Sequence, residues 1–180
     1  MIKKTGFTLI EMLVTVLIVG ILAAIAYPQY HKSVLKTEYV KTTVLVDALW
    51  QTAEEYYLAN GHYPNNFDYL GTDMPGNCSM EGTGLKCDDL SKKGWGKINM
   101  SSWESGSPYA QRITIGKSSG GYQSGLQYQR FFTRQSNPKY TFFNGGYPGM
   151  AICTASGDEA MKVCGIVGKV INPGGSYFII

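Results

Sequence analysis

The sequence predicts an α+β fold in which a long N-terminal helix packs on a small antiparallel β-sheet with disulfide-closed loops. An apolar run fills residues 7–26, a helical pattern of apolar residues continues to residue 59, and short alternating segments separated by glycines follow. The 180 residues suffice for one modest domain plus one long helix. With 16% charged and 13% aromatic residues, the composition is that of an ordered protein.

The apolar run contains a single charge, Glu11. As a helix it would be about 30 Å long, which matches the hydrocarbon core of a bilayer. It could be a plain membrane anchor, or a signal peptide with Lys3 and Lys4 as its basic region and Ala24-Ile25-Ala26 as its cleavage site. Both alternatives leave Glu11 without a role, although such a charge costs about 2.5–3.5 kcal/mol at the centre of a membrane helix.

A third interpretation gives Glu11 a role. The segment Gly6-Phe7-Thr8-Leu9-Ile10-Glu11 follows a short basic leader, and Tyr27-Pro28 ends the apolar run. This arrangement resembles the N-terminus of type IV prepilins and of the related pseudopilins. The resemblance implies that a membrane-bound prepilin peptidase cuts after Gly6 on the cytoplasmic side and N-methylates Phe7. The apolar segment then stays on the protein.

The resemblance also implies that Glu11 pairs with the Phe7 amine of a neighbouring subunit. A positive amine at a helix N-terminus opposes the helix dipole, so a nearby anion is favoured. Such a pair in apolar surroundings adds little net stability, but breaking it is expensive, so it can fix register. Charges alone do not settle the membrane orientation, because Lys3 and Lys4 precede the run and several basic residues follow it. The motif and the cysteines place the residues after 30 outside the cytoplasm.

The helical pattern of residues 29–60 has apolar residues on one side and charges between them. Asn60-Gly61 predicts a left-handed stop, with Pro64 beyond it. Pro28 predicts a kink, and Gly20 weakens the helix earlier. Resemblance to filament pilins implies that the stretch between them unwinds on assembly; the alternative is a simple bend at the membrane surface.

The C-terminal part predicts a β-rich domain after an irregular loop at residues 65–92. Strands are predicted over residues 111–117, 125–134, 139–143 and 150–154, joined as an antiparallel meander. A short helix carrying Cys164 is predicted to start near Ser156.

The four cysteines all lie in this part and form no C-x-x-C pair, which argues against zinc and for disulfides in an oxidising compartment. The short loops favour Cys78–Cys87 and Cys153–Cys164, and pilins commonly have a disulfide-bounded loop near the C-terminus. The sequence does not exclude the other pairings.

The sequence gives little support for catalysis, metal binding or DNA binding. Only His31 and His62 are present, beside the long helix, so no catalytic triad can be assembled, and we predict a non-enzyme without cofactor or metal. Asp88-Asp89 lacks calcium-ligand spacing. A mixture of basic and aromatic residues could bind single-stranded DNA weakly, although a strand with core and surface faces explains it equally well. This set is Arg130, Phe131, Phe132, Arg134, Lys139 and Tyr140.

The predicted organisation is a leader (1–6), an apolar transmembrane and filament-core helix (7–28), an amphipathic helix (29–60) and a β-rich head (61–180). The resemblance implies a type IVa-like pilus subunit that serves adhesion, twitching motility or DNA uptake. Its expected partners are copies of itself, minor pilins, the prepilin peptidase and the inner-membrane assembly machinery. The precursor is expected in the inner membrane with its head outside, and the mature subunit at the cell surface. A type II secretion pseudopilin, a minor pilin, and a secreted binding protein with an ordinary signal peptide are the alternatives.

Overall fold

The structure, a computed structural model, describes residue 6 and residues 8–71, 77–101, 112–118, 125–133, 149–170 and 177–180. It divides into two compact units, Met1–Glu38 and Tyr39–Ile180. The boundary between these units falls inside the first helix, so that helix contributes to both.

That helix, α1, extends over Leu9–Asn60 without interruption at Gly20 or Pro28. It ends where the sequence predicts, because Gly61 adopts a left-handed φ of 75° and its N–H donates to the Tyr57 carbonyl at 2.8 Å. The kink at Pro28 and the unwinding between Gly20 and Pro28 on assembly remain predictions.

The second unit contains an antiparallel sheet in the order β1-β2-β3-β4-β5-β6-β8-β7. The first six strands follow one another as the predicted meander, and only the last two exchange places. The strands are β1 (Cys78–Glu81), β2 (Gly84–Cys87), β3 (Ile98–Ser101), β4 (Arg112–Ser118), β5 (Gly125–Phe131), β6 (Ala151–Ala155), β7 (Lys169–Val170) and β8 (Tyr177–Ile179). The short helices are η1 (Phe67–Leu70), α2 (Asp88–Ser91) and α3 (Asp158–Val167).

Three predicted strands are confirmed with small changes of bounds, as β4, β5 and β6. The predicted helix carrying Cys164 is α3. The prediction that residues 65–92 form an irregular loop is wrong, because they contain η1, the β1–β2 hairpin and α2. The strands β1 and β2 have four residues each and are joined by a turn at Gly82, which has φ 69°. Strands this short do not show a clear alternation of apolar and polar residues in the sequence. The predicted strand at 139–143 lies outside the described residues.

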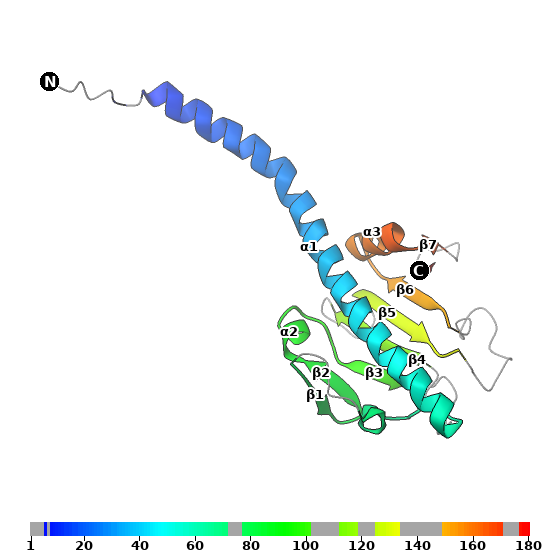
Figure 1. The fold of residues 1–180 in the computed structure, drawn as a ribbon. Coiled ribbons are helices and arrows are strands. Elements are labelled where there is room, and N and C mark those ends of the chain that lie inside the picture. The colour runs from blue at the N-terminus through cyan, green and yellow to red at the C-terminus, as the bar shows by residue number, and fades with distance from the viewer. Residues whose placement is uncertain are drawn as a thin grey trace. The chain divides into compact units, whose positions relative to one another are not determined.

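The second half of α1 crosses one face of this sheet (Figure 1). Its buried side chains recur every three or four residues, as the amphipathic pattern predicts. They are Tyr39, Thr42, Val46, Leu49 and Ala53. From the sheet, Ile113, Ile115, Leu126 and Tyr128 are buried.

Polar contacts fix the position of the helix on the sheet. The Tyr128 hydroxyl donates to Asp47 Oδ1 at 2.6 Å, and Arg130 lies 3.5 Å from the same oxygen. The Arg130 guanidinium stacks on the Trp50 ring at 4.3 Å, while Trp50 Nε1 donates to the Phe131 carbonyl at 2.9 Å. These contacts join Asp47 and Trp50 of α1 to β5. They hold this part of the helix against the sheet.

A second anchor lies near the helix end. Glu54 accepts hydrogen bonds from the Thr133 N–H at 2.7 Å and the Thr133 hydroxyl at 2.8 Å. The Tyr63 hydroxyl also donates to Glu54, at 2.9 Å, and the Tyr63 ring stacks on Phe132. Glu54 therefore ties the helix both to the residues after β5 and to its own exit turn.

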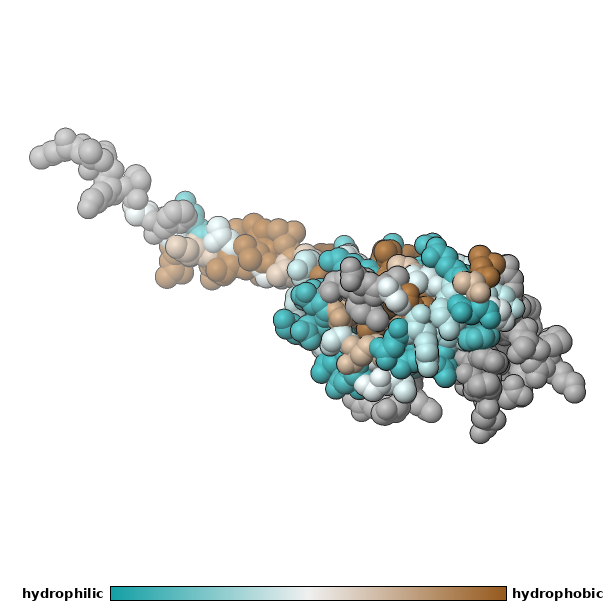
Figure 2. Space-filling view, turned by 60° about the horizontal axis from the view of Figure 1, so that its bottom comes forward, coloured by the Kyte–Doolittle hydropathy of each residue, from teal (hydrophilic) through white to brown (hydrophobic). Residues whose placement is uncertain are grey.

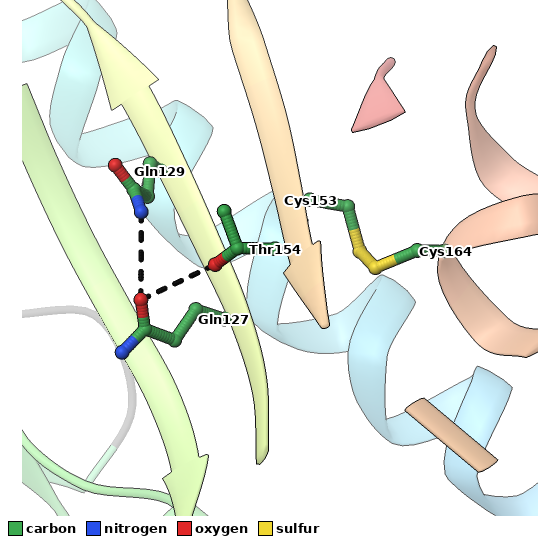
Figure 3. Close-up of a disulfide and its surroundings, with 5 residues drawn as sticks. All are labelled: Gln127, Gln129, Cys153, Thr154 and Cys164. Atoms are coloured by element: carbon green, nitrogen blue, oxygen red, sulfur yellow. Dashed lines mark hydrogen bonds between the residues drawn. A yellow bond between two sulfur atoms is a disulfide. The ribbon is translucent and has the colours of Figure 1, made fainter. Parts of the chain in front are cut away.

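Two disulfides close loops in this unit. Cys78 bonds to Cys87 across the β1–β2 hairpin, and Cys153 bonds to Cys164, joining β6 to α3. Cys153 pairs in register with Tyr128, so it points to the sheet face that α1 covers. Figure 3 shows this disulfide and, on the other face of the sheet, Gln127, which accepts hydrogen bonds from Thr154 and Gln129.

Candidate functional site

The N-terminal half of α1 exposes its apolar side chains on every side. Large hydrophobic residues from Leu9 to Ile25 are all exposed, from 83% at Leu9 to 44% at Val14. Figure 2 shows these hydrophobic side chains as a brown run. By length and hydropathy, α1 is the one described helix that could cross a membrane. A soluble monomer rarely exposes so much contiguous apolar surface, so this surface indicates a membrane or a partner.

Glu11, the single charge of the run, lies in the first turn of α1. Its Oε2 atom accepts a hydrogen bond from the Thr8 N–H at 2.8 Å and another from the Thr8 hydroxyl at 2.7 Å. In return the Glu11 N–H donates to the Thr8 hydroxyl oxygen at 3.3 Å. Thr8 and Glu11 thus form a capping box, in which each side chain satisfies a backbone donor that the helix start leaves without a partner.

The capping box places the carboxylate at the helix start, where the positive end of the helix dipole favours it. Only one carboxylate oxygen is used. Within the described residues, Glu11 Oε1 accepts no hydrogen bond and is exposed with the rest of the side chain. One oxygen therefore orders the helix start while the other remains available to a donor from another molecule.

The other residues of the predicted cleavage motif have simple surroundings. Gly6 is exposed, and a Cβ built on it would meet no atom within 4 Å. Phe7, the predicted methylation site, lies outside the described residues. The structure therefore brings Glu11 together with Thr8, and the pairing of Glu11 with a Phe7 amine remains a prediction.

Thr8 is the residue that the sequence reasoning missed. Its signal is the pattern Thr-x-x-Glu at residues 8–11, which is the usual sequence form of a capping box. From the sequence, Glu11 was expected to pair only with a Phe7 amine. The Thr8 hydroxyl was therefore given no role.

The DNA-binding hypothesis loses part of its basis. Phe131 and Phe132 are buried and cannot stack on bases, while Arg130 is engaged by Trp50 and Asp47. Arg134, Lys139 and Tyr140 lie outside the described residues.

The structure places both histidines on or beside α1. His62 lies in the turn after α1, with Nδ1 3.3 Å from the Tyr63 carbonyl, and His31 is exposed on the helix beside Tyr27. Among the described residues no group of His, Cys, Asp or Glu could hold a metal ion. Asp88 and Asp89 begin the four-residue helix α2.

Comparison with known proteins gives this geometry a context. Residues 1–27 match a family model described as the prokaryotic N-terminal methylation motif. The chain is 37% identical over 72 residues to the type IV major pilin protein PilE1 of Neisseria gonorrhoeae, covering 40% of this chain and 44% of that protein. It is 37% identical over 77 residues to a fimbrial protein of Neisseria meningitidis serogroup A, covering 41% and 45%. A fimbrial protein of Pseudomonas aeruginosa is 46% identical over 55 residues, covering 31% and 36%.

The match thus spans less than half the length of these curated relatives. Their names describe them as pilin or fimbrial proteins. The methylation motif, the exposed apolar helix with its N-terminal carboxylate, and the disulfide-closed α+β head occur together in this chain. Together with the matches to type IV pilin and fimbrial proteins, these features support a place for the chain in the type IV pilin family.

Proposed function

We propose that this protein is a structural subunit of a type IV pilus, cut after Gly6, N-methylated on Phe7 and assembled into an extracellular filament. The observation that supports this most strongly is the apolar half of α1, which is exposed on all sides and carries one carboxylate at its start. The match of residues 1–27 to the methylation motif supports the processing step.

The same surface suits two environments in succession. In the membrane, lipid tails cover the apolar half of α1, and in a filament the corresponding helices of other copies cover it. Both surroundings are apolar, so moving the helix from one to the other changes its apolar burial little. The specific interactions that distinguish the filament from the membrane must then be polar.

Glu11 is the group that makes this distinction. After cleavage the Phe7 amine is a cation in apolar surroundings, and an unpaired charge there is costly. We place the Glu11 carboxylate of a neighbouring copy on that amine, with Thr8 holding Oε2 so that Oε1 faces outward. The pair satisfies both charges only when two copies are in register.

Processing is tested by mass spectrometry of the mature chain from the cells that make it. The expected N-terminus is N-methylated Phe7. Loss of Lys3 and Lys4 lowers the count of basic residues from 16 to 14, against 13 acidic residues, so the formal charge falls from +3 to +1. A chain that begins at Tyr27 would identify an ordinary signal peptide instead and refute the proposal.

Assembly is tested with Glu11→Gln, which keeps the shape of the side chain and removes its charge. Breaking one partner of a buried pair costs about 3–5 kcal/mol, so filaments should be rare or absent by electron microscopy. Cleavage after Gly6 should continue, and the processed subunit should accumulate in the membrane. Glu55→Gln, on an exposed turn of the same helix, is the matched control and should assemble normally. Abundant filaments from Glu11→Gln would show that the charge pair does not drive docking.

A further inference from the structure

Two lysines follow the apolar half of α1 on the side where basic residues are usually scarce. In membrane proteins, basic residues gather on the cytoplasmic side of a spanning helix. The proposed cleavage removes Lys3 and Lys4, and no lysine or arginine occurs at residues 7–31. The first basic side chains of the processed chain are therefore Lys32 and Lys36, on the outer side in the proposed orientation. This distribution favours an anionic partner on that side.

These two residues, which we call the lysine pair, lie at the depth of the lipid headgroups. The apolar run ends at Ala26, and α1 continues through both lysines. The helical rise places their Cα atoms about 9 Å and 15 Å beyond the run, while headgroups extend about 5–8 Å beyond the hydrocarbon core. Helical side chains lean toward the N-terminus, here toward the membrane, and the long lysine stem brings the ammonium among the headgroups.

Two tyrosines mark the same depth. The side chains of Tyr27 and Tyr30 are 71% and 69% exposed, and the Tyr27 ring packs against the His31 ring with centroids 6.4 Å apart. Tyrosine is enriched where membrane and water meet, because its ring is apolar and its hydroxyl is polar. The lysine pair comes directly after these rings in the sequence.

No acidic residue of the helix neutralises the lysine pair. An acidic partner on the same face would stand three or four residues away, and the sequence has none at these distances from either lysine. The two lysines are one turn apart, and like charges at this spacing disfavour a helix. Both are exposed, and within the described part of the chain neither forms an ion pair. The result is a local positive charge that an external anion would neutralise.

We infer that the lysine pair binds the phosphate of an anionic phospholipid while the subunit is held in the membrane. The inference rests on the proposed function, since it concerns the membrane stage that precedes assembly. Lysine binds phosphate as a point charge, and two ammonium groups one turn apart share the charge of one headgroup or of two adjacent ones. The depth of the pair selects a lipid phosphate over a phosphate free in solution.

This contact opposes the Glu11 pair. Lipid tails and neighbouring helices are both apolar, so polar contacts decide between membrane and filament. The lysine–phosphate contact favours the membrane, and the pair of Glu11 with a neighbouring amine favours the filament. The lysine pair therefore retains the unassembled subunit in the bilayer at a fixed depth, and the subunit leaves its lipid when it docks.

The lipid preference of the full chain tests the inference. The chain is reconstituted into vesicles of equal parts phosphatidylcholine and phosphatidylglycerol, and spin-labelled forms of the two lipids measure how much of each the protein holds. Each lysine near an anionic surface strengthens binding by about fivefold, so Lys32→Gln should lower the preference for phosphatidylglycerol by about that factor. Lys32→Gln combined with Lys36→Gln should bring the two lipids to nearly equal association.

Lys41→Gln is the matched control. It removes the same charge from the same helix, but Lys41 has Glu38 three residues before it and lies farther from the apolar run. This variant should keep the lipid preference, and so should Lys32→Arg with Lys36→Arg, which retains both charges. Glutamine and arginine form helices about as well as lysine, so α1 stays intact in each variant.

A free anion is tested in the same vesicles. Inorganic phosphate added at constant ionic strength should leave the preference unchanged, and displacement of phosphatidylglycerol by phosphate would refute a lipid ligand. Equal association of both lipids with a wild-type chain that retains its apolar run would overturn this inference alone, as would an equal loss from Lys41→Gln and Lys32→Gln. A mature chain that begins at Tyr27 has lost the run, and then the proposed function fails together with this inference.

Discussion

The Tyr128 hydroxyl offers a sharp test of how α1 is held on the sheet. Tyr128→Phe removes the hydrogen bond to Asp47 Oδ1 at 2.6 Å and keeps the ring, which packs edge-on against Tyr39. No cavity forms, so the loss is that of one hydrogen bond to a charged acceptor, about 1.5–3 kcal/mol. The Asp47 side chain is 43% exposed and keeps Arg130 as a neighbour, which favours the lower end, about 1.5 kcal/mol.

The pH dependence makes the prediction sharper. Burial raises the pKa of Tyr128 above its usual value, and the hydrogen bond to Asp47 raises it further. A raised pKa means that the folded phenol stays neutral while the unfolded phenol, with a pKa of about 10, ionises. The stabilisation by Tyr128 is therefore complete below pH 10 and is lost as pH rises above it. At pH 11 the ionised unfolded state gains about 1.4 kcal/mol, nearly the whole contribution of the hydroxyl.

The assay is urea unfolding of the full chain in detergent at pH 8 and pH 11, with wild type and Tyr128→Phe compared at each pH. The difference in unfolding free energy should be about 1.5 kcal/mol at pH 8 and close to zero at pH 11. Tyr39 is present in both proteins, and burial also raises its pKa, so its contribution cancels in the comparison. A difference that stays constant between the two pH values would refute the reasoning.

Two further substitutions test the same interface. Leu49→Ala removes a fully buried side chain between helix and sheet and should destabilise the protein by about 2–5 kcal/mol in the same urea assay, whereas Leu58→Ala, at a position 69% exposed, should change stability by less than about 0.5 kcal/mol. Glu54→Gln weakens its bonds to Thr133 and Tyr63 and should cost about 1–2 kcal/mol by thermal unfolding. An unchanged midpoint for Glu54→Gln would show that these bonds do not hold the helix end.

Much of the helix was predictable because its signals are long. The apolar run and its amphipathic continuation indicate a helix over many consecutive residues. Asn60-Gly61 marks the end of that helix at one position. The hairpin at Cys78–Cys87 was missed because strands of four residues leave little room for alternation, and glycines and cysteines there resemble a loop. Its register was nonetheless implied by the cysteines, which stand directly opposite each other across Gly82.

Some residues of the candidate site could be named from the sequence, and others could not. Gly6, Phe7 and Glu11 could be named as candidates because a motif fixes their spacing, and their roles remain predictions. The role of Thr8 depends on local hydrogen-bond geometry, which a search for charge partners overlooks. The exposure of Val40 and Val44 could not be predicted, because the sequence shows that they are apolar but does not show that the sheet covers the opposite side of the helix.

The continuity of α1 has a mechanical consequence. One helix carries both the exposed apolar half and the residues that bind the sheet, so a pull applied near its N-terminus reaches residues 47–54 through the backbone itself. There the bonds of Tyr128, Trp50 and Thr133 join the helix to β5 and to the residues just after it at separate points. Sliding the helix along the sheet would strain these crossing bonds together rather than one after another. Such a joint resists shear more strongly than any one of its bonds, and it should yield under force as a single abrupt event.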